Sequence, residues 1–126
     1  MDRALNLVSR LLLAQLFLVS GIGKIAGYAG TQGYMAAAGV PGALLPLVIA
    51  VEIGGGLALI AGFRTRFVAW TLAAFTLAAA ALFHHNFADQ MQLINFMKNL
   101  AIAGGLLVLA RCGAGAPSVD QGWAGR

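Results

Sequence analysis

The chain has 126 residues, of which 60% are hydrophobic and only 10% charged, and its mean hydropathy is +0.86. Soluble domains carry about 25% charged residues, and one of this size could not bury so much apolar surface. The net charge of +4 is spread between apolar runs, which argues against a nucleic-acid-binding patch, and a single cysteine excludes an internal disulfide. The composition therefore indicates one compact integral membrane domain.

Four apolar segments are long enough to cross a bilayer as helices, since a crossing takes about 20 residues. They cover about residues 5–25, 43–62, 68–83 and 92–110. Helical spacing predicts one stripe along the first segment, which is made of Arg10, Ala14, Phe17, Gly21 and Lys24. Arg10 and Lys24 lie near opposite ends of this segment, so we expect Arg10 to be an anchor that snorkels to the membrane interface.

The connection between the first two spans is rich in glycine. Residues 31–39 predict a short interfacial helix that ends at Gly39 and Pro41. Tyr28 and Tyr34 suit the headgroup level of a membrane. We favour an interfacial connector over a lid that covers the outer mouth of the bundle.

The second span contains Glu52, the only acidic residue in the four apolar segments. An unpaired ionisable group at this depth costs roughly 2.5–3.5 kcal/mol on insertion scales. Gly55 and Gly56 lie on the same helical face and allow a neighbouring backbone to approach closely. We therefore expect Glu52 to face the bundle and to have a partner.

Arginines mark one side of the predicted bundle: they precede the first span, join the second to the third, and follow the fourth. By the positive-inside rule, the N- and C-termini are cytoplasmic. We expect a four-helix membrane domain over residues 1–111 and a flexible cytoplasmic tail over residues 112–126.

The polar residues of all four spans are expected to converge in the outer half of the bundle. Counting 1.5 Å per residue places Glu52 roughly 13 Å and Lys98 roughly 10 Å from the outer boundary, which predicts a Glu52–Lys98 pair. The catalytic candidates are Glu52, Lys98 and His85. The candidate binding residues are Glu52, Lys98, Asn95, Asn99, Lys24 and His84. A purely structural pair that fixes helix register is the alternative.

A metal site is not expected at the two adjacent histidines. Neighbouring positions on a helix point about 100° apart, so His84 and His85 would not chelate one ion together. A proton-handling role suits a histidine better.

A set of motifs follows in order along the four spans and their connections: Ser20–Lys24, Gly39–Pro41, Glu52–Gly56, Gly62 with Thr65–Arg66, His85–Asn86, Phe96–Ala101 and Gly104–Leu106. Through these motifs the chain resembles the DoxX family of small bacterial inner-membrane proteins. The resemblance implies an all-α bundle of four transmembrane helices that crosses the inner membrane several times. Some relatives are linked to thiosulfate:quinone oxidoreductase subunits, and others to redox-defence complexes with soluble partners. The family supplies no settled catalytic residues.

Three functions are compatible with these residues. The first is a redox-associated subunit that binds a quinone or a small solute in an outer-half polar pocket, with a soluble or membrane redox partner. The second is a non-enzymatic scaffold that stabilises partner proteins or forms homo-oligomers. The third is a small-solute or proton pathway. The sequence leaves open whether the protein is an enzyme.

Overall fold

The computed structural model describes residues 2–121, and its elements are helices. They are α1 (Asp2–Ala26), α2 (Tyr28–Ala37), the short 3₁₀ helix η1 (Gly42–Leu44), α3 (Leu45–Ala61), α4 (Thr65–Phe83) and α5 (Gln90–Cys112). Within this described part, four helical segments are long and apolar enough to cross a membrane: Asp2–Ala26, Gly42–Ala61, Thr65–Phe83 and Gln90–Cys112. The predicted all-α architecture with four spans is confirmed.

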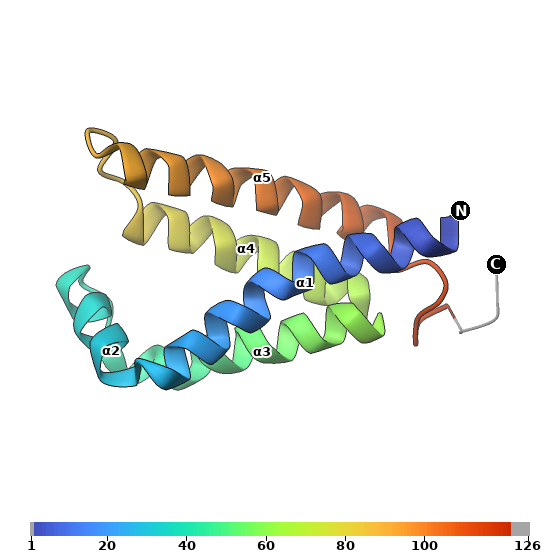
Figure 1. Cartoon of the computed structure of the whole chain (residues 1–126), viewed down its shortest axis with the longest axis horizontal. Helices are drawn as coiled ribbons and strands as arrows, with labels where there is room; N and C mark the ends of the chain where they lie inside the picture. Colours follow the sequence, from blue (N-terminus) through green and yellow to red (C-terminus); the bar gives the residue numbers. More distant parts are fainter. Residues whose placement is uncertain (1, 122–126) are drawn as a thin grey trace.

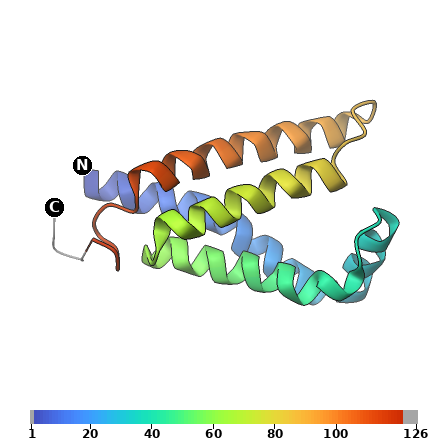
Figure 2. The ribbon, with the colours of Figure 1, turned by 180° about the vertical axis from the view of Figure 1, so that it is seen from behind.

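The four long helices form two pairs. Helix α1 packs along α3 and α4 packs along α5, and contacts between α3 and α4 join the pairs (Figures 1 and 2). The start of α1, the α3–α4 turn and the end of α5 lie together, and we call this the arginine end. The opposite end carries α2, which projects from the bundle, and we call it the α2 end (Figure 1).

Close contact between α1 and α3 depends on glycine. A Cβ atom at Gly21 would lie 2.6 Å from Cγ1 of Ile53, and one at Gly56 would lie 2.8 Å from Cγ of Leu18. Small residues at these positions let two membrane helices approach closely and gain dispersion contacts. The predicted stripe on α1 is largely confirmed, since Arg10, Ala14, Phe17 and Gly21 are its buried residues.

The apolar core lies between the two ends of the bundle. Its buried members are Ala14, Phe17, Leu59, Ala69, Leu72, Ala73, Leu106, Leu109 and Ala110. Large apolar side chains on the outward faces are exposed, including Leu12 (65%), Leu47 (62%) and Val108 (62%). These outward faces would contact lipid, as expected of a membrane-embedded bundle.

Arg10 differs from its expected role as a snorkelling anchor. Its side chain is fully buried. Its Nη1 donates to the carbonyl oxygens of Leu59 (3.2 Å) and Ile60 (3.0 Å), and its Nη2 donates to the carbonyl of Pro117. The snorkelling prediction was wrong because the chain returns from α5 and covers the guanidinium, which then satisfies carbonyls at the end of α3.

The first part of the expected flexible tail is packed against the bundle. Residues 113–121, which we call the C-terminal strap, donate from Val119 N to the carbonyl of Ala61 and from Asp120 N to that of Gly62, both at 2.9 Å. The Asp120 carboxylate accepts from the backbone N–H groups of Arg64 and Thr65, each at 2.8 Å, and so caps α4. Residues 122–126 of the predicted tail lie outside the described residues.

The charge state of Asp120 follows from this capping. Burial by itself raises the pKa of the Asp120 carboxyl, but hydrogen bonds from Thr65 and Arg64, together with the charge of Arg10, outweigh it. The net effect lowers the pKa of Asp120 below its usual value of 3.8. The C-terminal strap is therefore held against the start of α4 with the Asp120 carboxylate ionised.

Candidate functional site

Glu52 faces the bundle, as predicted, and its partner is Lys24. The residue is 4% exposed, and Lys24 Nζ lies 2.8 Å from its Oε1. Lys24 Nζ also lies 3.1 Å from the hydroxyl oxygen of Ser20, one turn earlier on α1. The ion pair with Lys24 is the polar contact of Glu52 Oε1, which forms no further hydrogen bond within the described residues.

The predicted Glu52–Lys98 pair is therefore wrong. The depth count correctly placed both residues in the half of the bundle at the α2 end, but depth does not say which helices are neighbours. Helix α3 packs on α1 rather than on α5, and Lys98 is exposed. The close packing at Gly21 brings Lys24 to Glu52: a Cβ at Gly21 would lie 3.3 Å from Glu52 Cβ, and Lys24 is one turn further along the same face of α1.

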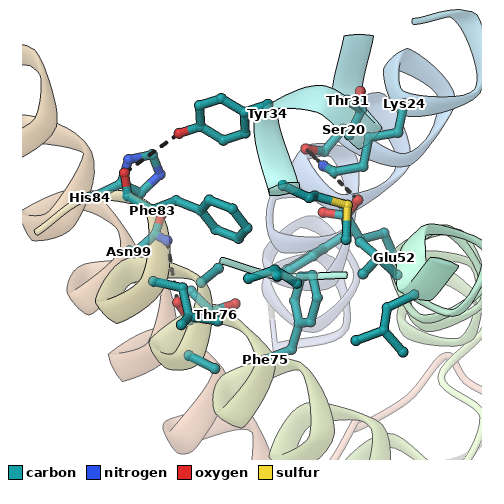
Figure 3. A pocket seen from close by; sticks show the side chains of 18 of the residues that line it. Ser20, Lys24, Thr31, Tyr34, Glu52, Phe75, Thr76, Phe83, His84 and Asn99 are labelled. Carbon is teal, nitrogen blue, oxygen red and sulfur yellow. Dashed lines mark hydrogen bonds and ion pairs between the residues drawn. The ribbon is translucent and has the colours of Figure 1, made fainter. Parts of the chain in front are cut away.

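A cavity of about 380 Å³ opens beside the ion pair at the α2 end (Figure 3). We call it the α2-end cavity. Its lining includes the polar and aromatic side chains of Ser20, Lys24, Tyr34, Glu52, Phe75, Thr76, Phe83, His84 and Asn99. Lys24, Ser20 and Glu52 come from the α1–α3 pair, whereas Thr76, His84 and Asn99 come from the α4–α5 side (Figure 3). Two walls with polar groups thus face each other across an apolar interior.

Four of the predicted site residues line this cavity: Lys24, Glu52, His84 and Asn99. The other three do not. Lys98 and His85 are exposed, and Asn95 is half-buried outside the lining.

Thr76 is a site residue that sequence reasoning missed. It is 4% exposed, and its hydroxyl has no hydrogen-bond partner among residues 2–121. The neighbouring Asn99 Nδ2 donates instead to the Thr76 backbone carbonyl at 3.2 Å. A threonine in an Ala-rich span gives no sequence signal, because such hydroxyls ordinarily bond within their own helix. Thr71 does so, donating to the carbonyl of Phe67 at 3.0 Å.

Among the described residues, Glu52 Oε1 on one wall has only its ion-pair contact with Lys24, and Thr76 Oγ1 on the facing wall has no hydrogen-bond partner. Buried polar groups in native proteins are nearly always hydrogen-bonded, either to protein or to water. Their shared location on one cavity indicates a place where a polar ligand or water completes the bonding.

Helix α2 covers the cavity. The Tyr34 ring stacks on Phe83 of α4, with centroids 5.2 Å apart and planes inclined by 20°, and its hydroxyl lies 3.5 Å from the Phe83 carbonyl oxygen. Thr31 and Met35 of α2 also line the cavity. The predicted short helix is present as Tyr28–Ala37; it connects the first two spans, and three of its side chains also line the cavity.

His84 lies at the edge of the cavity, just after α4 ends. Burial lowers the pKa of its imidazole, and the positive charge of Lys98 lowers it further. His84 is therefore neutral near pH 7 and able to accept a hydrogen bond or a proton. The charge of Lys98 is thus felt by His84, whereas Glu52 is paired with Lys24.

The described residues contain no cluster of three or more histidine, cysteine, aspartate or glutamate side chains that could hold a metal ion. Cys112 is exposed at the arginine end, far along α5 from the cavity.

Comparison with known proteins places the chain in a family. The DoxX family model matches residues 5–85, a range that includes Lys24, Glu52 and His84 but not the α5 motif. The chain is 57% identical over 115 residues to the inner membrane protein YqjF of Escherichia coli K12, covering 91% of this chain and 88% of that protein. It is 37% identical over 124 residues to the inner membrane protein YphA of the same organism, covering 93% and 89%. No solved structure matches. The chain therefore belongs to the DoxX family and is a multi-pass inner membrane protein.

Proposed function

We propose that this protein is a redox-associated membrane subunit whose α2-end cavity binds a quinone or another small amphipathic solute. The observation that carries the proposal is the buried Thr76 hydroxyl, which has no hydrogen-bond partner among residues 2–121 and faces the Lys24–Glu52 ion pair across one cavity. A volume of about 380 Å³ lies within the usual range for small-molecule sites, about 300–1,000 Å³.

The lining suits a flat ring with a polar group at each side. Phe75 and Phe83 supply apolar aromatic surface between the two polar walls (Figure 3). On one wall, the Lys24 ammonium can donate to a carbonyl or a phenolate oxygen. On the other wall, the Thr76 hydroxyl can donate to, or accept from, a second polar group.

Glu52 and His84 are the residues that would accept or donate protons. A bound quinone would supply the electron-transfer chemistry, with two electrons and two protons exchanged per ring. His84, neutral near pH 7, can accept a proton at the cavity edge, and Lys24 can stabilise negative charge on the ligand. No residue of the chain is an evident electron carrier, so a soluble or membrane-bound redox partner must donate or accept the electrons. The resemblance described in the sequence analysis, in which some relatives are linked to redox complexes with soluble partners, supports such a partner.

The orientation that we propose places the arginine end in the cytoplasm, because arginines favour that side. The α2-end cavity then lies in the outer half of the membrane. The apolar core, which includes Ala14, Leu59 and Leu72, separates it from the arginine end. That separation favours a binding pocket over a continuous solute or proton pathway.

The test uses purified full-length protein in detergent and a short-chain benzoquinone as the probe, with binding measured by equilibrium dialysis. Thr76→Val removes only the unpaired hydroxyl and should weaken binding about fivefold, the value of one neutral hydrogen bond. Thr71→Val is the matched control on the same helix, since its exposed hydroxyl bonds only Phe67, and it should bind as the wild type does.

Equal binding by the two threonine variants, or no binding by the wild type, would reject the quinone site. The scaffold alternative would then be favoured, because it requires no ligand in the cavity.

A further inference from the structure

A second cavity, of about 450 Å³, lies at the arginine end between the start of α4 and the C-terminal strap. Its lining includes Arg64, Arg66, Phe67, Gly113 and Asp120. We call it the arginine-end cavity. It shares no lining residue with the α2-end cavity, and its interpretation does not rest on the function proposed above.

Arg66 is held so that one edge of its guanidinium stays available. Its Nη1 donates to the carbonyl of Arg111, at the end of α5, at 2.9 Å. Within residues 2–121, its Nε and Nη2 donate to no protein acceptor. Because the Nη1 contact limits rotation of the guanidinium group, less side-chain entropy is lost when a ligand binds.

Gly113 keeps side-chain atoms away from that edge. A Cβ at residue 113 would lie 3.2 Å from Nε and 3.4 Å from Nη2 of Arg66, and 3.6 Å from Cζ. Because the two nitrogens are nearer than the carbon, the position lies beside the Nε–Nη2 edge rather than over the flat face. This edge matches the two oxygens of a phosphate or a carboxylate in bidentate geometry.

The charges around the cavity favour an anion. Arg64 and Arg66 are both exposed on its wall. Asp120 is the acidic group in the lining, but its two oxygens already accept from the N–H groups of Arg64 and Thr65. The helix N-terminus therefore offsets its charge, which leaves the two guanidinium groups to dominate the field.

The position of the cavity identifies the source of the anion. Aromatic side chains beside it are exposed: Phe63 by 51%, Phe67 by 69% and Trp70 by 61%. Phe67 lines the cavity, and Trp70 lies one turn further into the span on the same face of α4. Such aromatic groups mark the level of lipid headgroups, and they would contact an acyl chain below a headgroup held by Arg66.

We propose that the arginine-end cavity binds the phosphate of an anionic phospholipid, with Arg66 as the bidentate ligand and Arg64 as the second cation. The lipid would bridge α4 and the end of α5. It would thereby join the α3–α4 turn to the C-terminal strap.

The test is native mass spectrometry of the full-length protein, purified in detergent and titrated with phosphatidylglycerol or phosphatidylcholine. Wild type should bind phosphatidylglycerol about tenfold more tightly than phosphatidylcholine. Both lipids carry a phosphate, but the choline ammonium offsets its charge and is repelled by Arg64 and Arg66. Arg66→Gln should remove this preference, and Arg66→Lys, which keeps the charge without the fork, should reduce it. Lys98→Gln removes an equal charge at the α2 end and should leave the preference unchanged.

Two results would overturn the proposal: equal lipid preference in Arg66→Gln and Lys98→Gln, or protection from thermal unfolding by inorganic phosphate as strong as that by the lipid. The second result would indicate a free-anion site. Circular dichroism checks that each variant is folded. If Arg66→Gln does not fold, the lipid preference of Arg66→Lys is compared with that of Lys98→Gln instead. Quinone binding should be unchanged in every Arg66 variant, which separates this proposal from the previous one.

Discussion

Replacing the two members of the Lys24–Glu52 pair, singly and together, is the sharpest test of the site. The variants are Lys24→Met, Glu52→Gln and the double variant. The two side chains differ in exposure, 26% for Lys24 and 6% for Glu52. The two single changes should therefore not be equivalent.

The magnitudes follow from the geometry. At the observed 2.8 Å, two unit charges attract by about 6 kcal/mol at an effective dielectric constant of 20. Desolvation of both groups offsets most of this attraction. Lys24→Met leaves a buried carboxylate without a cation and should lower the free energy of unfolding by about 3 kcal/mol. Glu52→Gln leaves an ammonium that water can still reach, so it should cost about 1 kcal/mol. The coupling energy of the pair should be about 2 kcal/mol.

The assay is reversible unfolding of the purified protein in mixed detergent micelles, followed by circular dichroism. Lys98→Met is the control, because Lys98 is exposed and should change the free energy of unfolding by less than about 0.5 kcal/mol. A Lys98→Met effect as large as that of Lys24→Met, or a coupling between residues 24 and 52 near zero, would refute this pairing. If the double variant is folded but does not bind the quinone, the Lys24–Glu52 pair takes part in ligand binding as well as in stability.

Three further predictions concern other parts of the chain. Arg10→Ala should lower the free energy of unfolding by about 3–5 kcal/mol, because it removes a fully buried side chain together with its hydrogen bonds to the carbonyls of Leu59, Ile60 and Pro117; a loss below about 1 kcal/mol, measured by the same unfolding assay, would contradict this role of Arg10. The lowered pKa of Asp120 means that its contribution to docking the strap is fully present above the usual carboxyl value of 3.8 and is lost as the pH falls through the lower native pKa. A spin label at Gln121 should therefore become mobile in acid, and in Asp120→Asn the label should be more mobile near pH 7 than in the wild type; mobility that is independent of pH in the wild type would argue against this capping. Finally, Lys98→Gln should raise the pKa of His84, because one of the two causes that lower it is removed; histidine NMR titration measures the change, and an unchanged value would show that the charge of Lys98 does not reach His84.

Several features could be predicted from local sequence because they depend on one helix at a time. Span lengths, the buried stripe on α1 and the inward face of Glu52 follow from apolar periodicity and from the cost of burying a charge in lipid. Gly55 and Gly56 were recognisable as close-contact positions because they share the helical face of Glu52.

The partner of Glu52 could not be predicted in this way. Lys24 and Lys98 both lie in the half of the bundle that contains Glu52, and only the packing of α1 on α3 selects Lys24. The unpaired hydroxyl of Thr76 was equally hidden, because its environment is set by other helices. Arg10 has the sequence position of a surface anchor, yet the strap, more than one hundred residues away in the chain, covers it.

The sequence alone determined the class of the protein, the number and depth of its spans, and a carboxylate that must find a cation inside the bundle. These properties follow from transfer free energies and from the rise of a helix, which depend on nearby residues. Only the tertiary structure decided that Lys24 supplies the cation, that α2 covers the cavity and that the strap covers Arg10. Such choices depend on which helix faces share an interface. A count of residues along one helix does not say how that helix is rotated about its axis or which helices lie next to it.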